Sequence, residues 1–240
     1  MGVAARIAGP MRRSLAVAWP IMAGYLVLGI PCGILSVAAG MQVWMCAVLS
    51  IVFYSGAGQY MIPNMWLAAN PVSSIIASVC LVNTRQMLYG TSLSRFCGNA
   101  GKGLSTAFAA TVTDESYGVN YAQFFNGDWS VSSALGVNLW SQTSWTVANV
   151  LGALVGTAIS VPTALASFAM TALFICLLCM QPFTSSNVAA MVGAVAGVVL
   201  CKSAGLEGVA ILVGAVVGVV AGCGCSSVRR SAEGDDPSCQ

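Results

Sequence analysis

The 240-residue chain has very little charge: nine lysines and arginines, seven aspartates and glutamates, and a net charge of +2. A soluble globular protein carries charge on about a quarter of its residues, whereas only 7% of this chain is charged. A net charge this small also gives no basic surface for nucleic acid. The scarcity of charge therefore excludes soluble enzymes and nucleic-acid-binding proteins.

Histidine is absent from the chain, which excludes Cys/His zinc sites and the usual histidine-dependent catalytic triads. The sequence also lacks the Gly-x-x-x-x-Gly-Lys motif that cradles phosphate, and this excludes a self-contained ATP-driven pump. The ten cysteines are mostly scattered through apolar segments, where we interpret them as small buried side chains. We therefore expect no enzymatic activity, no metal and no cofactor.

Apolar residues, by contrast, are abundant: they make up 58% of the chain, and the mean hydropathy is +0.84. Residues 14–84 and 129–201 contain no charged side chain at all. A membrane-spanning helix needs about 20 mostly apolar residues, so each stretch has room for about three spans. The sequence predicts an all-α integral membrane protein, a polytopic helical bundle with about six or seven crossing helices and with broken or re-entrant segments.

The predicted organisation is a cytoplasmic N-terminal segment, one transmembrane domain and a polar, disordered tail, with bounds 1–13, 14–225 and 226–240. Arginines occur near both ends of the chain, and the positive-inside rule then places both termini in the cytoplasm. We therefore expect a multi-pass protein of the plasma or inner cell membrane.

The predicted second span, residues 43–68, is interrupted at 54–60 by the string Tyr-Ser-Gly-Ala-Gly-Gln-Tyr. Two glycines among polar residues indicate a broken helix or a re-entrant loop. Unwound helices of this type form substrate sites in transporters, because their bare backbone carbonyls and amides bind the ends of a zwitterion. The alternative is a glycine notch that packs against a neighbouring helix. The polar groups of Gln59 and Tyr60 favour the binding site.

Arg85 is the one charged residue in the predicted third span, residues 72–94. Burying a guanidinium in a bilayer costs at least about 2.5–3.5 kcal/mol, so another interaction must offset that cost. The long side chain can reach the interface by snorkelling, or it can form a structural ion pair with Asp114 or Glu115. Its planar fork of donors also suits the carboxylate of a ligand. The sequence leaves these three alternatives open.

Asp114 and Glu115 are the only acidic residues before Asp128. Because Thr-Asp-Glu is a common start of a helix, Thr113 or Asp114 can simply be a helix cap. The functional alternative is a protonatable site that couples transport to a proton gradient, or a counter-charge for a substrate ammonium. We favour the cap for Asp114 and the functional role for Glu115.

Small residues recur at four-residue spacing in several predicted helices. This spacing lets helix backbones approach closely in lipid, where helix association depends on packing. We therefore assign a packing role to the pairs Gly152/Gly156, Gly193/Gly197, Gly214/Gly218 and Gly218/Gly222.

Four strings, in this order and at these spacings, resemble the AzlC family. They are Gly-Ile-Pro-Cys-Gly at 29–33, the string at 54–60, Asn-Thr-Arg-Gln-Met-Leu-Tyr-Gly-Thr-Ser-Leu at 83–93, and Asp-Glu at 114–115. Proteins of that family are membrane subunits of branched-chain amino acid exporters. The resemblance extends over residues 14–225. It implies export of leucine, isoleucine, valine or similar apolar amino acids, and a small AzlD-type membrane subunit as partner.

The residues and the resemblance together define an expected site. Asp114 and Glu115 would supply coupling or the counter-charge, and the substrate-binding residues would be Ser55, Gly56, Gly58, Gln59, Asn83, Arg85 and Tyr89. The family's third string usually reads Asn-x-Arg-His, whereas this chain has Gln86 in place of that histidine. If the histidine handles protons, its role is missing or moved here. The aspartate that often precedes the helix near Pro162 is also absent.

Two other functions compete with export. One is a non-transporting membrane scaffold or assembly subunit, for which packing faces rich in glycine and alanine would suffice. The other is a channel for small solutes.

Overall fold

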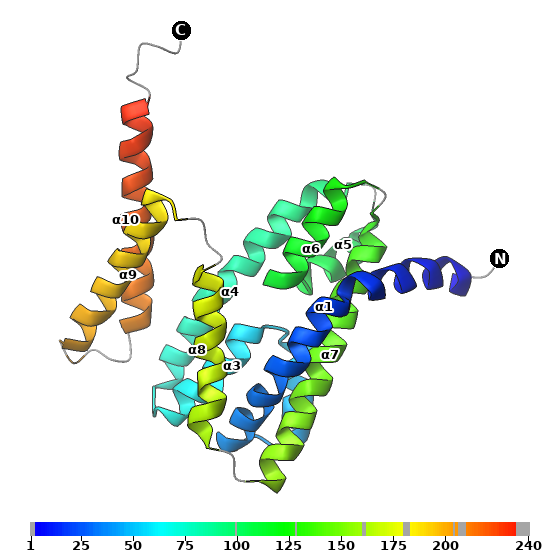
Figure 1. Ribbon diagram of the computed structural model, residues 1–240, viewed down its shortest axis with the longest axis horizontal. Coiled ribbons are helices and arrows are strands. Elements are labelled where there is room, and N and C mark those ends of the chain that lie inside the picture. Colours follow the sequence, from blue (N-terminus) through cyan, green and yellow to red (C-terminus); the bar gives the residue numbers. More distant parts are fainter. Residues whose placement is uncertain are drawn as a thin grey trace. The chain divides into compact units, whose positions relative to one another are not determined.

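The computed structural model of the protein describes residues 3–98, 100–127, 129–159, 162–179, 183–203, 205 and 210–233. Across these residues all regular secondary structure is helical, so the predicted all-α fold is confirmed. Figure 1 shows the helices, which are α1 (Val3–Ala38), α2 (Val43–Val52), α3 (Gly56–Leu67), α4 (Val72–Leu93), a 3-10 turn η1 (Ser94–Phe96), α5 (Lys102–Ala110), α6 (Asp114–Phe125), α7 (Val131–Ala158), α8 (Thr163–Cys179), α9 (Ser185–Ser203) and α10 (Ala210–Glu233).

The chain divides into two compact units, and the predicted organisation with one transmembrane domain stays a prediction. The first unit comprises Met1–Ala68 and Val82–Met170, and the second comprises Ala69–Leu81 and Thr171–Gln240. Helices α1, α2, α3, α5, α6 and α7 lie in the first unit, and α9 and α10 lie in the second. Every residue of the expected site belongs to the first unit.

Helices α1 and α7 pack lengthwise against each other in the first unit (Figure 1). Glycines allow this close approach. A Cβ atom on Gly33 would collide with the backbone carbonyl of Asn149, and one on Gly152 would collide with that of Ile30. The prediction that the Gly152/Gly156 pair serves helix packing is therefore confirmed.

Helix α7 carries polar side chains inward and apolar side chains outward. Asn138 and Ser141 are fully buried, and Asn149 is only 2% exposed. Val147 and Leu154, in contrast, are 46% and 49% exposed. A soluble protein buries its apolar side chains, whereas a helix in lipid exposes them and turns polar groups toward other helices. This pattern is that of a membrane protein.

Two described helical segments are long and apolar enough to cross a bilayer, by length and composition alone: Met11–Ala38 within α1, and Ser185–Ser203, which is α9. The total number of crossings stays a prediction.

The predicted interruption of the second span is confirmed. Helix α2 ends at Val52, and α3 begins at Gly56 with Ser55 as its N-cap. The first span is one continuous helix, because α1 runs through both Pro20 and Pro31.

The acidic segment begins a helix, but its cap is Thr113 and not Asp114. The Thr113 hydroxyl accepts a hydrogen bond from the backbone N–H of Ser116, and the Ser116 hydroxyl accepts one from the N–H of Thr113. Asp114 is the first residue of α6. Because the threonine hydroxyl satisfies the helix end, the Asp114 carboxylate is free to bind another partner.

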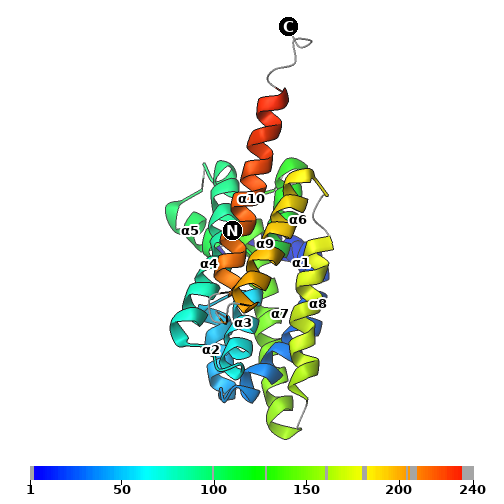
Figure 2. The same cartoon turned by 90° about the vertical axis from the view of Figure 1, so that its left-hand side faces the viewer.

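Helices α9 and α10 form a hairpin in the second unit, and they lie side by side in both views (Figure 1 and Figure 2). A Cβ atom on Gly218 would come 2.8 Å from the carbonyl oxygen of Ala190, and one on Gly193 would come 2.8 Å from the Cβ atom of Ala221. The packing role predicted for these glycines is confirmed.

Helix α10 continues to Glu233. Residues 226–233 are thus helical, although the sequence predicted a disordered tail from residue 226. The segment contains neither glycine nor proline to end the helix. Residues 234–240 of the predicted tail lie outside the described residues.

Candidate functional site

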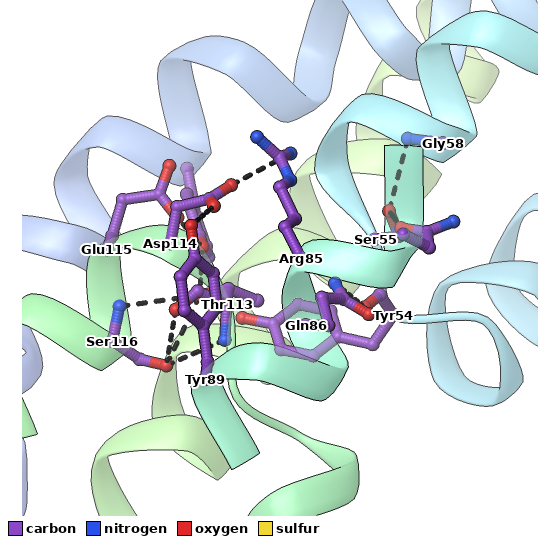
Figure 3. Close-up of polar contacts among 12 residues, drawn as sticks. Tyr54, Ser55, Gly58, Arg85, Gln86, Tyr89, Thr113, Asp114, Glu115 and Ser116 are labelled. Carbon is purple, nitrogen blue, oxygen red and sulfur yellow. Dashed lines mark hydrogen bonds and ion pairs between the residues drawn. The ribbon is translucent and has the colours of Figure 1, made fainter. Parts of the chain in front are cut away.

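Arg85 of α4 and Asp114 of α6 form an ion pair, with 2.9 Å between Nη2 and Oδ2. The two side chains are 27% and 21% exposed, so the pair is mostly enclosed. Figure 3 shows the Arg85 side chain extending toward Asp114. Of the three alternatives for Arg85, the ion pair is therefore the one observed. The guanidinium is not fully used, however, because Nε is buried without a hydrogen-bond partner.

Tyrosine hydroxyls bind both acidic side chains. Tyr89 of α4 donates to Asp114 Oδ1 at 2.6 Å. Tyr25 of α1 donates to Glu115 Oε2 at 2.7 Å, and its oxygen lies 2.8 Å from Thr113 Oγ1. Both oxygens of Asp114 are thus occupied. Glu115 has one hydroxyl donor, and no lysine or arginine nitrogen of the described residues lies within 4.0 Å of its carboxylate.

Tyr54, in the connection between α2 and α3, brings a further hydroxyl to this region. Its ring meets the Tyr25 ring edge-on, with 6.4 Å between the centroids. Figure 3 shows the Tyr54 side chain pointing toward Thr113 at the start of α6. The residue is only 8% exposed, and its hydroxyl has no hydrogen-bond partner. An unsatisfied buried hydroxyl is costly, so we expect a group from outside the chain to bind it.

A buried amide network fixes the connection between α5 and α6. Asn138 of α7 donates to Thr111 Oγ1 at 3.1 Å and to the Phe108 carbonyl at 3.3 Å, both at the end of α5. The side-chain oxygen Oδ1 of Asn138 accepts a hydrogen bond from Asn120 Nδ2 of α6 at 3.1 Å, and Asn120 Oδ1 accepts one from Trp129 Nε1 at 3.2 Å. The network ties α5, α6 and α7 together and thereby positions the acidic first turn of α6.

The break between α2 and α3 is capped and packed. Ser55 Oγ accepts from the Gly58 N–H at 3.1 Å and donates to Asn83 Oδ1 at 2.6 Å. This bond orients Asn83, whose Nδ2 is buried without a partner. Gly58 is a packing glycine, because a Cβ atom there would come 2.8 Å from the Phe53 ring. Gly56 is the first residue of α3.

Three glutamine side chains donate to backbone carbonyls near the end of α2: Gln59 to Phe53 at 2.5 Å, Gln86 to Tyr54 at 3.4 Å and Gln142 to Ile51 at 2.9 Å. Within the predicted break the Tyr54 carbonyl is thus not bare, and the carbonyls of Ile51 and Phe53 just before it are bound as well. The physical reason is that a carbonyl freed at membrane depth must be satisfied within the protein.

The other polar atoms of Gln59 are also bound. Its Oε1 accepts from Trp145 Nε1 at 3.0 Å and from Ser50 Oγ at 3.2 Å, and the residue is 1% exposed. Gln59 thus connects α2, α3 and α7. Gln86, at the position of the family's histidine, likewise holds the break through its bond to a backbone carbonyl.

A groove of about 600 Å³ lies between α4 and α5. It is lined by Asn83, Gln86, Met87, Gly90, Thr91, Ser94, Ala109 and Ala110. Asn83 therefore joins the capped break to an open face of the first unit.

The structure brings four of the predicted site residues into direct contact or adjacency: Arg85, Tyr89, Asp114 and Glu115. Ser55 and Asn83 are joined by a hydrogen bond away from this group, whereas the side-chain amide of Gln59 is hydrogen-bonded to other groups of the protein. In the part of the chain that the structure describes, no three acidic or cysteine side chains gather as metal ligands.

Sequence reasoning did not assign Tyr25 and Tyr54 to the site. Tyr25 is the one tyrosine of a mostly apolar first span, and Tyr54 lies in the 54–60 string without an assigned role. Neither pattern shows that the hydroxyl approaches residues of α6, because Tyr25 and Glu115 are separated by 90 positions.

Comparison with known proteins supports the family resemblance. The AzlC protein family matches residues 20–159, more than half of the chain. The branched-chain amino acid transport protein AzlC of Bacillus subtilis (strain 168) is 30% identical over 161 residues, which cover 65% of this chain and 61% of that protein. The chain thus matches less than two thirds of the Bacillus protein's length.

Two further relatives are membrane proteins. The inner membrane protein YgaZ of Escherichia coli (strain K12) is 29% identical over 192 residues, covering 75% of this chain and 78% of the relative. An uncharacterized membrane protein of Helicobacter pylori (strain ATCC 700392 / 26695) is 30% identical over 190 residues, covering 78% of this chain and 82% of the relative. No solved structure matches the chain. The chain belongs to the AzlC family and is a transport-related membrane protein.

Proposed function

We propose that the protein is a secondary transporter subunit that exports branched-chain or other apolar amino acids across the cell membrane. The observation that carries this proposal is the enclosed Arg85–Asp114 ion pair with Glu115 beside it. Ionisable residues at membrane depth are costly and by default functional. The name of the Bacillus relative, a branched-chain amino acid transport protein, supports the substrate class.

A zwitterionic amino acid fits the charges and donors of this region. Buried donors without partners, Arg85 Nε and Asn83 Nδ2, suit a substrate carboxylate. Glu115 has no cationic partner among the described residues and suits the substrate ammonium. The apolar substrate side chain would lie among aromatic rings such as Tyr25 and Trp145, whose centroids are 5.3 Å apart. In this proposal the break acts through Ser55, which orients Asn83, and not through its own carbonyls.

The unsatisfied donors favour a ligand site over a purely structural ion pair. A structural pair is most stable when every donor and acceptor around it is satisfied. Here a guanidinium nitrogen, an amide nitrogen and a tyrosine hydroxyl are all buried without partners. A scaffold subunit has no need of such groups, because close glycine packing of the kind found between α9 and α10 suffices for assembly.

The proposal includes a topology and a partner. The protein would cross the membrane about six or seven times, with both termini in the cytoplasm, and it would function together with a small AzlD-like membrane subunit. The α2–α3 break would then lie at membrane depth, where interrupted helices form transporter sites.

Efflux of labelled leucine or valine from loaded cells tests the proposal. We expect saturable efflux that depends on an ion gradient, with this chain alone or after co-expression of a candidate small subunit. Loss of efflux in Arg85→Ala and Glu115→Gln, with normal membrane insertion, would support the assigned site. Unchanged efflux in both variants would refute the site. Non-saturable efflux would indicate a channel. Absence of efflux both with this chain alone and with the small subunit would favour the non-transporting scaffold.

A further inference from the structure

Asp114 and Glu115 are neighbours in sequence, but only Asp114 has both carboxylate oxygens occupied. Arg85 holds Asp114 Oδ2 at 2.9 Å, and Tyr89 holds Oδ1 at 2.6 Å. Glu115 accepts one hydrogen bond, from Tyr25 to Oε2 at 2.7 Å, and no described residue donates to its Oε1. The charge of Asp114 is thus balanced within the protein, whereas the charge of Glu115 is not.

The charged and titratable groups around Glu115 come from four parts of the site. Tyr25 of α1 donates a hydrogen bond to it, and Tyr54 and Tyr89 lie close enough to interact with it electrostatically. Asp114, its neighbour in α6, is paired with Arg85 of α4. The only cation in this set is already paired with Asp114. One positive and two negative side chains therefore leave a surplus negative charge in an enclosed helical bundle, where an unbalanced charge is costly.

A second, independent feature indicates a ligand at this place. Tyr54 is 92% buried, and its hydroxyl lacks a partner. Its side chain points toward Thr113 at the start of α6 (Figure 3). The phenolic oxygen can accept a hydrogen bond from an ammonium group. Glu115 and Tyr54 thus offer a negative charge and an additional acceptor near the start of α6.

We propose that the Glu115 carboxylate binds a proton and the substrate ammonium alternately, so that the two compete for one group. This inference rests on the proposed export function. A proton on Glu115 neutralises the empty site, and the substrate ammonium neutralises the occupied one. Asp114 takes no part in this exchange, because Arg85 and Tyr89 hold it.

The exchange is balanced in atoms and charge. The protonated carboxyl group of Glu115 loses its proton to water, and the resulting carboxylate pairs with the ammonium of the amino acid. No covalent bond to the substrate forms or breaks. When the substrate leaves, a proton returns to Glu115. Because one carboxylate alternates between the two cations, export of one amino acid is linked to entry of one proton.

Proton release during substrate binding tests this inference on the purified full-length protein. Leucine binding is measured by calorimetry in buffers with different heats of protonation, over the pH range in which leucine stays zwitterionic. In the wild type we expect leucine binding to release up to about one proton per leucine, in an amount that depends on pH. Glu115→Gln should release none at any pH.

A matched probe separates the ammonium from the rest of the substrate. 4-Methylpentanoate has the carbon skeleton and carboxylate of leucine but lacks the ammonium. Glu115→Gln should weaken leucine binding about 10- to 100-fold, the effect of losing a charge-assisted bond, and should leave 4-methylpentanoate binding unchanged. Tyr54→Phe should weaken leucine binding by a smaller factor, leave 4-methylpentanoate binding unchanged and still release a proton.

The possible failures are distinguishable. Leucine export without proton release at any pH, or equal release from Glu115→Gln, overturns this inference and leaves export intact. If the wild type neither binds nor exports any amino acid, the proposed function fails and this inference fails with it. If Glu115→Gln does not fold, the pH dependence of release from the wild type alone decides the question.

Discussion

The Arg85–Asp114 pair gives a sharp prediction, because removing its two members leaves different charges behind. Arg85→Gln leaves the Asp114 carboxylate without its cation, so two unpaired carboxylates, Asp114 and Glu115, remain in a largely enclosed region. Asp114→Asn leaves one cation, Arg85, and one carboxylate, Glu115, in the region, and the new amide oxygen still accepts the hydrogen bond from Tyr89. We therefore expect Arg85→Gln to be the more destabilising change.

The magnitude follows from the partial exposure of the pair. Breaking a fully buried pair costs about 3–5 kcal/mol, whereas an exposed pair contributes about 0–1 kcal/mol. At 27% and 21% exposure, we expect about 2–3 kcal/mol for Arg85→Gln and about 1 kcal/mol for Asp114→Asn. The double variant removes both charges, so it should be more stable than Arg85→Gln alone, by about 1 kcal/mol.

A double-mutant cycle on the purified protein in detergent measures these differences. Unfolding midpoints of the wild type, the two single variants and the double variant are compared at one pH and one salt concentration. The expected order of stability is wild type, Asp114→Asn, the double variant, then Arg85→Gln. Strictly additive single effects would show that the two side chains do not interact, and equal losses in both single variants would refute the charge argument.

Three further predictions concern the elements that support the site. Gly33→Ala should destabilise the protein severely, because the added Cβ atom meets the Asn149 carbonyl, while the matched Gly24→Ala on the same helix, where nothing lies within 4 Å, should be neutral or raise the melting temperature. Asn138→Leu should lower the free energy of unfolding by about 2–3 kcal/mol, because it removes the buried side-chain hydrogen bonds at the α5–α6 connection. A melting temperature equal to that of the wild type would argue against that network. Ser55→Ala should cost about 1 kcal/mol as a lost helix cap and should also weaken leucine efflux, since Asn83 loses its orienting bond; efflux equal to wild type would remove Asn83 from the site.

The sequence predicted the break between α2 and α3 because glycines and polar side chains are unusual in the middle of an apolar span. It also singled out Arg85, Asp114 and Glu115, because so few charges lie away from the ends and connections of this chain. Scarcity made each of these residues informative, and the structure brings Arg85 and Asp114 into contact.

The sequence could not predict which side chains would hydrogen-bond to the backbone carbonyls at the helix break or to the acidic residues of the site. Gln142 reaches the carbonyl of Ile51 across 91 positions, and Tyr25 reaches Glu115 across 90. Bonds of this range depend on how helices pack, and no local pattern encodes that packing. The helix cap was misassigned for a related reason: threonine and aspartate are both good caps, and only the position of Arg85 shows which of them has another partner.

Transport by purified protein in liposomes tests the central claim most directly. The wild-type chain is reconstituted alone and with a candidate small subunit, the vesicles are loaded with labelled leucine, and a proton gradient is imposed. We predict saturable leucine efflux that the proton gradient accelerates, that loses this acceleration when a proton ionophore is added, and that Glu115→Gln loses. Leucine movement that is absent in both preparations, or that is unsaturable and indifferent to the ionophore, would contradict it.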